Sequence, residues 1–394
     1  MPPGILLKRI FFRYKGENEM AEKTLLFVGD TAPKRDDMDS MFAKTNDFLH
    51  DCDLLFGQLE AVVTDKGAPA CQSRLPLRIY PSAAPCLKKA GFDVMSNAGN
   101  HIMDWGFEGY YDTMKHMADA GIDIVGAGDN IDEARKPIIK VLDDGTKVGF
   151  LGYCSILPQD YWALPDRPGA NPMRGITAAP CIEHDQPGTP VRIYSWPHPD
   201  DLQNMIDDIQ ALRPQVDILV VSQHWGIHFT PAVIADYQRY VGHFAIDNGA
   251  DIVVGHHTHI LKGIEVYKGK PLVYSLANFA TEGPAAYFEG KRGLINDSRH
   301  GDIRKLNKDF EKNPKRTMPF DSCMTVVLKV VIEDKKVKKV SYLPCWIDDD
   351  TFVPEIVTPD NEKFQKIVDY MEEITVSQKI EPHFTVDGNE VIIG

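Results

Sequence analysis

Residues 217–279 read DILVVSQHWGIHFTPAVIADYQRYVGHFAIDNGADIVVGHHTHILKGIEVYKGKPLVYSLANF. The apolar runs at 217–221 and 251–254 are each bounded by polar residues, which is typical of buried strands in a parallel sheet. Between them, Pro231 begins a segment with helical character that ends at Asn248 and Gly249, a helix stop. This stretch therefore predicts a β-α-β unit in an α/β fold.

Histidines follow both strands of this unit. The first strand leads into QHWG (223–226) and the second into GHHTH (255–259). Ligands of open α/β sheets bind at the carboxyl ends of the strands. A His-x-His pair and a further His on the neighbouring strand can point several neutral nitrogens at one divalent metal ion. The alternative is a set of hydrogen-bonded loop histidines, and the clustering favours the metal site.

Three more predicted strands, at 24–29, 53–57 and 93–97, also lead into polar residues. Asp30 follows the first strand and Glu60 follows the second. The third leads into AGNHIMDWG (98–106), where an amide, an imidazole and a carboxylate can act as ligand, proton donor and orienting group. Taken alone, Asp30 is equally consistent with a turn or a helix cap.

Six sequence blocks occur in order with regular spacing. They are GD (29–30), QLE (58–60), AGNHxxDWG (98–106), HWG (224–226), GHHTH (255–259) and YSLANF (274–279). This set resembles the capsule-synthesis CapA family, a branch of the calcineurin-like metallophosphoesterase superfamily, over about residues 24–280. The resemblance implies the fold of that superfamily, a four-layer α/β/β/α sandwich.

The resemblance also implies a centre of two divalent metal ions, which would be Mn, Fe or Zn. The ligands that it carries over are Asp30, Glu60, Asn100, His224, His257 and His259. His101 would be the general acid or a transition-state stabiliser, held by Asp104. The superfamily's first block is D-x-H, whereas this chain has Asp30-Thr31-Ala32, so one metal position lacks a histidine.

Four further residues are candidates to contact the substrate: Arg78, Arg167, Arg174 and His228. Arg167 and Arg174 lie in the segment 157–200, which holds nine of the chain's 27 prolines and is predicted to be a lid over the site. The alternatives are a packed surface loop for this segment and a surface ion pair for Arg78. His228 either lines the pocket or compensates for the missing ligand, whereas His256 is expected to have a structural role.

The remaining sequence predicts one large domain with two additions. Residues 1–20 are expected to form an N-terminal tail, residues 21–350 the metallophosphoesterase-like domain, and residues 351–394 a C-terminal helix and tail that pack on it. Helices are predicted at 35–49, 83–90, 107–120, 200–213 and 360–375. A β-hairpin over 322–346 is predicted to turn at Asp334-Lys335, and the basic stretch 288–319 to be a solvated loop.

Composition restricts the function further. A net charge of −14 argues against a nucleic-acid surface, so we expect no nucleic acid, and the short apolar run at 6–12 predicts no membrane span. Seven scattered cysteines without a CxxC spacing fit reduced thiols and a cytoplasmic location. The leading hypothesis is a metal-dependent hydrolase of a phosphoester or a γ-glutamyl amide, acting on a small or polymeric anionic substrate. The alternative is a component of poly-γ-glutamate capsule synthesis that binds polymer through its metal site.

Overall fold

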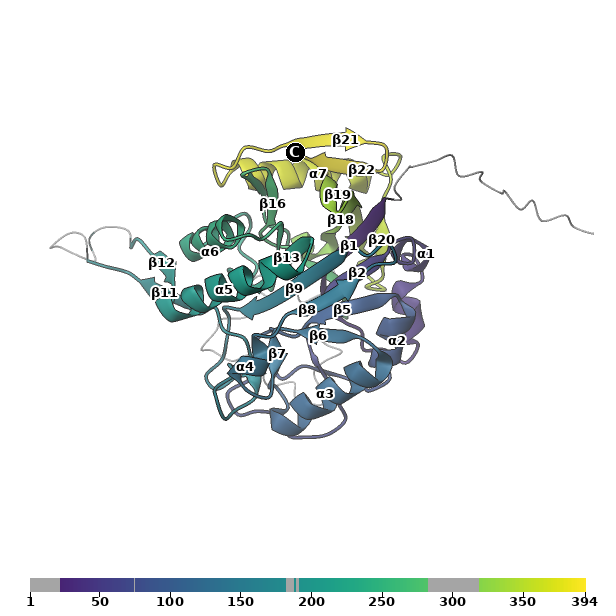
Figure 1. The fold of residues 1–394 in the computed structure, drawn as a ribbon. Coiled ribbons are helices and arrows are strands. Elements are labelled where there is room, and N and C mark those ends of the chain that lie inside the picture. The colour runs from purple at the N-terminus through teal and green to yellow at the C-terminus, as the bar shows by residue number, and fades with distance from the viewer. Residues whose placement is uncertain (1–21, 74, 182–187, 189–190, 283–318) are drawn as a thin grey trace, which may run out of the picture.

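Two β-sheets pack face to face in the computed structural model, and helices cover the outer face of each (Figure 1). The structure describes residues 22–73, 75–181, 188, 191–282 and 319–394. The arrangement is the four-layer α/β/β/α sandwich that the sequence predicted. The predicted tail 1–20 and nearly all of the basic stretch 288–319 lie outside the described residues.

The first sheet has the strand order β21-β22-β19-β18-β1-β2-β5-β6, with β17 beside β1 and β20 beside β19. Its strands are β1 (Lys23–Ala32), β2 (Leu54–Leu59), β5 (Phe92–Ser96), β6 (Asp123–Val125), β17 (Asn278–Thr281), β18 (Met324–Glu333), β19 (Lys336–Ile347), β20 (Pro354–Ile356), β21 (Phe384–Asp387) and β22 (Glu390–Ile393). Strands β1, β2, β5 and β6 run parallel, so their carboxyl ends share one edge.

The second sheet has the order β15-β16-β14-β13-β9-β8. Its strands are β8 (Ile138–Val141), β9 (Lys147–Cys154), β13 (Ile218–His224), β14 (Ile252–His256), β15 (Ile264–Tyr267) and β16 (Lys270–Val273). The parallel pairing of β13 with β14 and the helix between them confirm the β-α-β unit predicted over 217–254.

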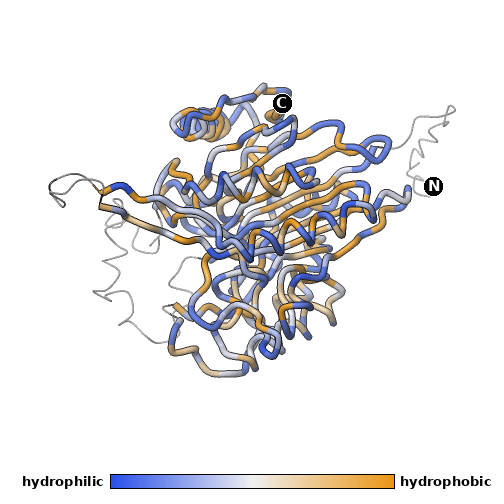
Figure 2. The backbone as a smooth tube through the Cα atoms, turned by 60° about the vertical axis from the view of Figure 1, so that its left-hand side comes forward, coloured by the Kyte–Doolittle hydropathy of each residue, from blue (hydrophilic) through white to orange (hydrophobic). Residues whose placement is uncertain are grey.

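The main core lies between the two sheets. Phe56 of β2 stacks on Phe150 of β9, with ring centroids 5.4 Å apart. Helix α7 (Glu362–Val376) adds Phe364, Ile367 and Met371 to the same core. The hydropathy colouring agrees, since apolar segments gather in the strands at the centre of the molecule (Figure 2).

Separate apolar clusters join each sheet to its helices. Helices α2 (Ala83–Lys89) and α3 (Gly106–Ala120) cover the first sheet, together with the shorter η1 (Met38–Phe42) and α1 (Asn46–Leu49). Helices α5 (Pro199–Leu212) and α6 (Asp236–Asp247) cover the second. Within the part of the chain that the structure describes, every helix is too short or too polar to span a bilayer.

The segment 157–200 is partly regular in structure. It contains β10 (Gly169–Ala170), which pairs with β7 (Ala127–Gly128), and the hairpin of β11 (Gly175–Ala178) and β12 (Tyr194–Pro197). This hairpin extends away from the body of the molecule (Figure 1). The remaining short elements are β3 (Val62–Val63), β4 (Arg78–Ile79), α4 (Ile131–Ala134), η2 (Arg213–Gln215) and η6 (Phe320–Cys323).

Candidate metal centre

Five strands direct polar side chains to one place between the two sheets. Strands β1, β2 and β5 of the first sheet and β13 and β14 of the second supply them, from within the strand or just after it. The residues are Asp30, Glu60, Asn100, His224, His257 and His259. Apart from Asn100, which is partly exposed, all are buried. The sequence-predicted ligands therefore converge.

An irregularity in β1 sets the direction of Asp30. The N-terminal part of β1 pairs with β18, whereas Asp30 pairs with Asn278 of β17, and the register shifts on both sides of it. Such bulges redirect side chains beside functional sites. Strand β17 approaches closely because residue 29 is glycine: a Cβ there would lie 2.1 Å from the carbonyl oxygen of Ala277. Asp30 thus lies inside β1, not just after it as predicted.

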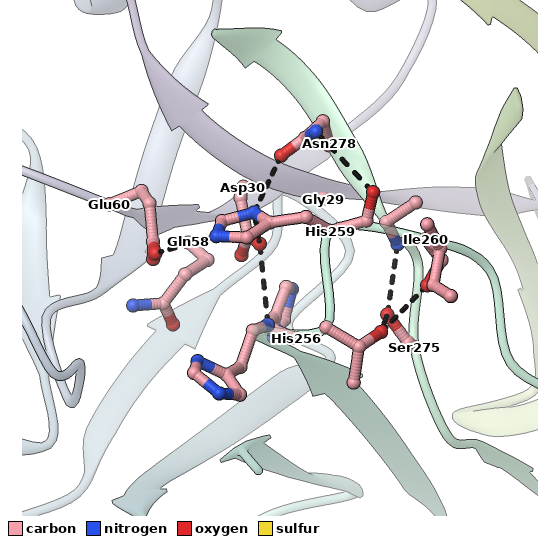
Figure 3. Close-up of polar contacts among 12 residues, drawn as sticks. Gly29, Asp30, Gln58, Glu60, His256, His259, Ile260, Ser275 and Asn278 are labelled. Atoms are coloured by element: carbon pink, nitrogen blue, oxygen red, sulfur yellow. Dashed lines mark hydrogen bonds and ion pairs between the residues drawn. The ribbon is translucent and has the colours of Figure 1, made fainter. Parts of the chain in front are cut away.

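Asp30, Glu60 and His259 form the first ligand group. One ligand atom from each lies within 4.8 Å of the others, and Figure 3 shows the three side chains turned toward one another. His259 Nδ1 is 3.1 Å from Asp30 Oδ2, and His259 Nε2 is 3.6 Å from Glu60 Oε1. His259 Nδ1 also donates to Asn278 Oδ1 at 2.8 Å, which fixes the ring orientation.

Asn100, His224 and His257 form the second ligand group. Asn100 Oδ1 lies 2.6 Å from His224 Nε2 and 3.3 Å from His257 Nδ1, and the two ring nitrogens are 3.2 Å apart. Glu60 connects this group to the first, because its Oε2 is 3.7 Å from His224 Nε2. A single carboxylate therefore stands between both sets of nitrogens.

The backbone that carries the His-x-His pair is in the left-handed region. His257 has φ of 90° and His259 has φ of 56°. Non-glycine residues adopt such angles at a cost of about 1–3 kcal/mol each, and they gather at functional sites. This conformation lets the rings of His257 and His259 face the centre. The side chain of His256 points away from the centre, toward the carbonyl of Val28.

Several buried carboxylate oxygens in the cluster have no hydrogen-bond donor among the described residues. They are both Oε atoms of Glu60 and Oδ1 of Asp30. A buried, unpaired carboxylate is strongly unfavourable, whereas a cation would satisfy all three oxygens. Mixed carboxylate, amide and imidazole donors suit divalent ions such as Mn, Fe or Zn. The residues present therefore fit the predicted metal.

Burial sets the protonation of the ligands. Burial lowers the pKa of His224 to about 3 and that of His257 well below its usual value, so both rings are neutral at pH 7, as metal ligation requires. Burial, and then the charges of Asp30 and Asp104, raise the pKa of Glu60 well above its usual value. Burial alone would also raise the pKa of Asp30, but the hydrogen bond from His259 and the surrounding imidazoles outweigh it and lower that pKa.

His101 and Asp104 form a hydrogen-bonded pair beside the cluster. His101 Nδ1 donates to Asp104 Oδ2 at 2.5 Å, and its Nε2 lies 3.8 Å from Glu60 Oε1. Because the carboxylate can only accept this bond, Nδ1 carries a proton and Nε2 faces the centre. The structure thus brings both residues predicted for proton transfer to the ligand groups.

His228 and His256 take different positions around the centre. The ring of His228 stacks on His257, with centroids 3.9 Å apart, and lies 5.2 Å from the ring of His259. It therefore covers the His-x-His pair, and its role toward substrate stays a prediction. His256 is buried and its Nε2 donates to the carbonyl of Val28 at 3.3 Å, which fits the predicted structural role.

The three candidate arginines contact other residues of the chain, and two of them pair with carboxylates. Arg174 donates to both carboxylate oxygens of Asp201, at 2.8 and 2.7 Å. Arg167 donates to Asp160 at 2.7 Å and to the carbonyl of Trp162. These internal pairs engage the guanidinium groups that were predicted to hold substrate. Arg78 stacks on Trp105 at 3.8 Å, next to Asp104, and remains a predicted substrate contact.

Two further residues take part in the site. Asn278 orients His259, and it stands in the YSLANF block, whose position among the six blocks was the available signal. Tyr161 donates to Asp104 at 3.0 Å from within the proline-rich segment. No spacing in the sequence connects Tyr161 with Asp104, because only the folded chain brings the proline-rich segment to the loop after β5.

Curated relatives resemble this chain over about three fifths of its length. The PGA biosynthesis protein CapA of Bacillus subtilis is 31% identical over 242 residues, which cover 61% of this chain and 56% of that protein. The capsule biosynthesis protein CapA of Bacillus anthracis is 28% identical over 245 residues, covering 61% and 53%. The chain thus spans little more than half the length of these relatives.

Solved structures resemble the chain more weakly. A hypothetical protein from Thermus thermophilus aligns with a TM-score of 0.43 and 14% identity, covering 82% of this chain and 98% of that one. The calcineurin-like phosphoesterase YfkN from Bacillus subtilis aligns with a TM-score of 0.40 and 14% identity, covering 91% and 98%.

The family comparison covers the whole set of ligand-bearing blocks. The model described as bacterial capsule synthesis protein PGA_cap matches residues 24–282, which run from the second residue of β1 to one residue past the end of β17. This range agrees with the resemblance drawn from the six blocks at 24–280. The chain belongs to the bacterial capsule synthesis protein PGA_cap family.

Proposed function

We propose that this chain is a metal-dependent hydrolase that cleaves a phosphoester or a γ-glutamyl amide in an anionic substrate. The observation that carries the proposal is the convergence of two ligand groups on Glu60, with the His101–Asp104 pair directly beside them. Buried carboxylates without donors support a cation site. A properly placed acid next to that site supports catalysis over simple metal storage.

Two divalent ions, of Mn, Fe or Zn, would be held by residues already described. Asp30, Glu60 and His259 would hold one, and Glu60, Asn100, His224 and His257 the other. When bound, such ions supply Lewis-acid activation of water and of a substrate oxygen. Asn278 keeps His259 oriented by accepting a hydrogen bond from Nδ1, which leaves Nε2 directed at Glu60.

The chain's own residues would move the proton. In its imidazolium form, His101 carries a proton on Nε2, the nitrogen that faces the centre, and would give it to the leaving group. Asp104 stabilises the imidazolium and fixes the plane of the ring by accepting from Nδ1. A poor leaving group needs this proton, whereas a good one departs without it.

The names of the matched relatives support the choice of substrate class. They describe synthesis of PGA and of capsule, so a γ-glutamyl polymer or fragment is the first amide to test, beside phosphodiesters. We propose that residues 21–350 form the catalytic domain and that 351–394 pack on it. Arg167 and Arg174 stay predicted contacts for an anionic substrate, each already paired with a carboxylate of the chain.

A screen of the purified, metal-reconstituted chain tests the proposal. Hydrolysis of either substrate class should depend on added divalent metal and should fall in His224→Ala. His116→Ala is the control, because that residue pairs with Asp112. Turnover that is unchanged after metal removal would refute a metal-dependent mechanism.

The second candidate function is a polymer-binding component of capsule synthesis. One observation favours it: a relative from Mycobacterium tuberculosis, 29% identical over 263 residues, is named as a polyglutamine synthesis accessory protein. This function predicts metal-dependent binding of poly-γ-glutamate with no cleavage. Equilibrium binding of the polymer, followed by analysis of its chain length, separates the two functions.

A further inference from the structure

Asp104 accepts hydrogen bonds at both of its oxygens from four different groups. Oδ2 accepts from His101 Nδ1 at 2.5 Å and from the backbone N–H of Leu77 at 2.7 Å. Oδ1 accepts from Ser73 Oγ at 2.7 Å and from the Tyr161 hydroxyl at 3.0 Å. A carboxylate has about four lone-pair positions, so the four donors occupy all the acceptor positions of Asp104. Two donors on each oxygen fix the plane of the carboxylate.

Tyr161 is rigidly placed for this contact. Its side chain has no exposed surface and packs in a small cluster with Ala98 and Ile102, from the same loop that carries His101. Its carbonyl accepts the backbone N–H of Ala170 at 2.9 Å, and the bridge between Trp162 and Ala170 continues this pairing. The hydroxyl therefore has one position available, and that position is at Asp104.

We infer that Tyr161 is a positioning residue for proton transfer, acting on His101 through Asp104. The hydroxyl and Ser73 together hold Oδ1, which turns Oδ2 toward His101. Without the hydroxyl, Oδ1 keeps only the bond from Ser73, so the carboxylate and the imidazole that it orients are held less firmly. The proline-rich segment thus contributes to the centre through Tyr161, deep inside the protein.

The kinetic part of this inference depends on the proposed hydrolase function. In Tyr161→Phe, kcat for a substrate with a poor leaving group should fall about 10- to 100-fold, since positioned general acids contribute about 10²–10⁴-fold. The KM for that substrate, the metal content and the kcat for an activated aryl ester should be unchanged. This split between substrates is not expected from a merely loosened fold.

Tyr153→Phe is the matched control. Tyr153 is equally buried, and its hydroxyl also donates to a carboxylate, that of Asp208 at 2.9 Å, but this pair contacts neither His101 nor Asp104. It should keep the full rate with both substrates. Equal losses in the two variants, or a loss in Tyr161→Phe that is the same for both substrates, would overturn the inference.

Proton NMR provides a test that needs no turnover. The Nδ1 proton of His101 should give a downfield resonance that is absent in His101→Ala. This resonance should shift or broaden in Tyr161→Phe and stay in place in Tyr153→Phe. If the wild type hydrolyses nothing, the proposed function fails while this measurement still decides the role of Tyr161.

An unchanged resonance in folded Tyr161→Phe contradicts the positioning role. If that variant does not fold, 3-fluorotyrosine at position 161 replaces it, because the ring and hydroxyl remain while the hydroxyl becomes a stronger donor. The resonance should then move, and no movement would contradict the inference equally.

Discussion

Glu60 is the residue on which both ligand groups depend. Its two oxygens face His259 in one group and His224 in the other, so its loss should affect both metal positions. We expect Glu60→Gln to lower bound metal further than His257→Ala, which removes a nitrogen from one group only. Elemental analysis of the purified variants checks this, with His116→Ala retaining the wild-type content. Equal metal loss in the two ligand variants would show that Glu60 does not serve both groups.

His101 should matter for rate and not for metal. His101→Ala removes the nitrogen that faces the centre but none of the proposed ligands. We expect about a 10²–10⁴-fold lower kcat with a poor leaving group and unchanged metal content. Steady-state kinetics and elemental analysis on the same preparation test this. A full rate with the poor leaving group would remove His101 from the mechanism.

Single residues of the site could be predicted from the sequence wherever a polar residue follows an apolar run. That rule located Asp30, Glu60, His224 and the His-x-His pair, because parallel strands bring their carboxyl ends together. The rule does not reveal ion pairs, since nothing in the sequence shows that Arg174 lies within 2.8 Å of Asp201. Ion-pair partners far apart along the chain are set by the fold, and a free arginine and a paired one look alike in sequence.

At the scale of the elements, the turn between β18 and β19 places two non-glycine residues in the left-handed region. Asp334 and Lys335 have φ of 53° and 62°, the left-handed pair that two-residue hairpins require and that glycine adopts without cost. Lys335→Gly should therefore raise the free energy of unfolding by about 0.5–1 kcal/mol. Denaturant titration measures the change.

The neighbouring residue gives the control for this substitution. Lys336 is the first residue of β19 and does not have positive φ. Lys336→Gly should lower stability by about 0.5–1 kcal/mol, because glycine in a strand only adds backbone freedom to the unfolded chain. If both substitutions change the free energy of unfolding in the same direction, the argument from backbone conformation is contradicted.

Strand positions were predicted more accurately than helix positions. Five apolar runs became β1, β2, β5, β13 and β14, and the hairpin turned at the predicted residues. The helix predicted at 35–49 is instead the short η1 and α1, and the one expected from Pro231 begins at Asp236. The C-terminal hairpin of β21 and β22 was missed, although Gly388-Asn389 between alternating residues is a known turn signal.

For the whole molecule, metal and stability should be coupled. Without a cation, Asp30 and Glu60 are two carboxylates buried side by side, which is unfavourable for the folded state. Metal at about 100 times its Kd should add about 2.7 kcal/mol per site. Thermal unfolding with and without EDTA should therefore show a Tm several degrees lower after chelation.

Glu60→Gln supplies the comparison for this measurement. If the effect of EDTA arises at this centre, the variant should have a Tm that EDTA barely changes. A wild-type Tm that EDTA leaves unaltered would mean that the buried carboxylates are not stabilised by a metal ion.

The position of β1 bears on how the protein is made. One edge of β1 pairs with β2, which is synthesised shortly afterwards, but the other edge pairs with β17 and β18, which follow the entire second sheet. During translation, the apolar residues 25–28 therefore remain beside a bare edge, which invites aggregation. Asp30 and Glu60 leave the ribosome early, whereas His257, His259 and Asn278 leave late. A metal ion held by both the carboxylates and these imidazoles would therefore bind only after residues up to 278 have been made, and shorter products would carry Asp30 and Glu60 without the histidines.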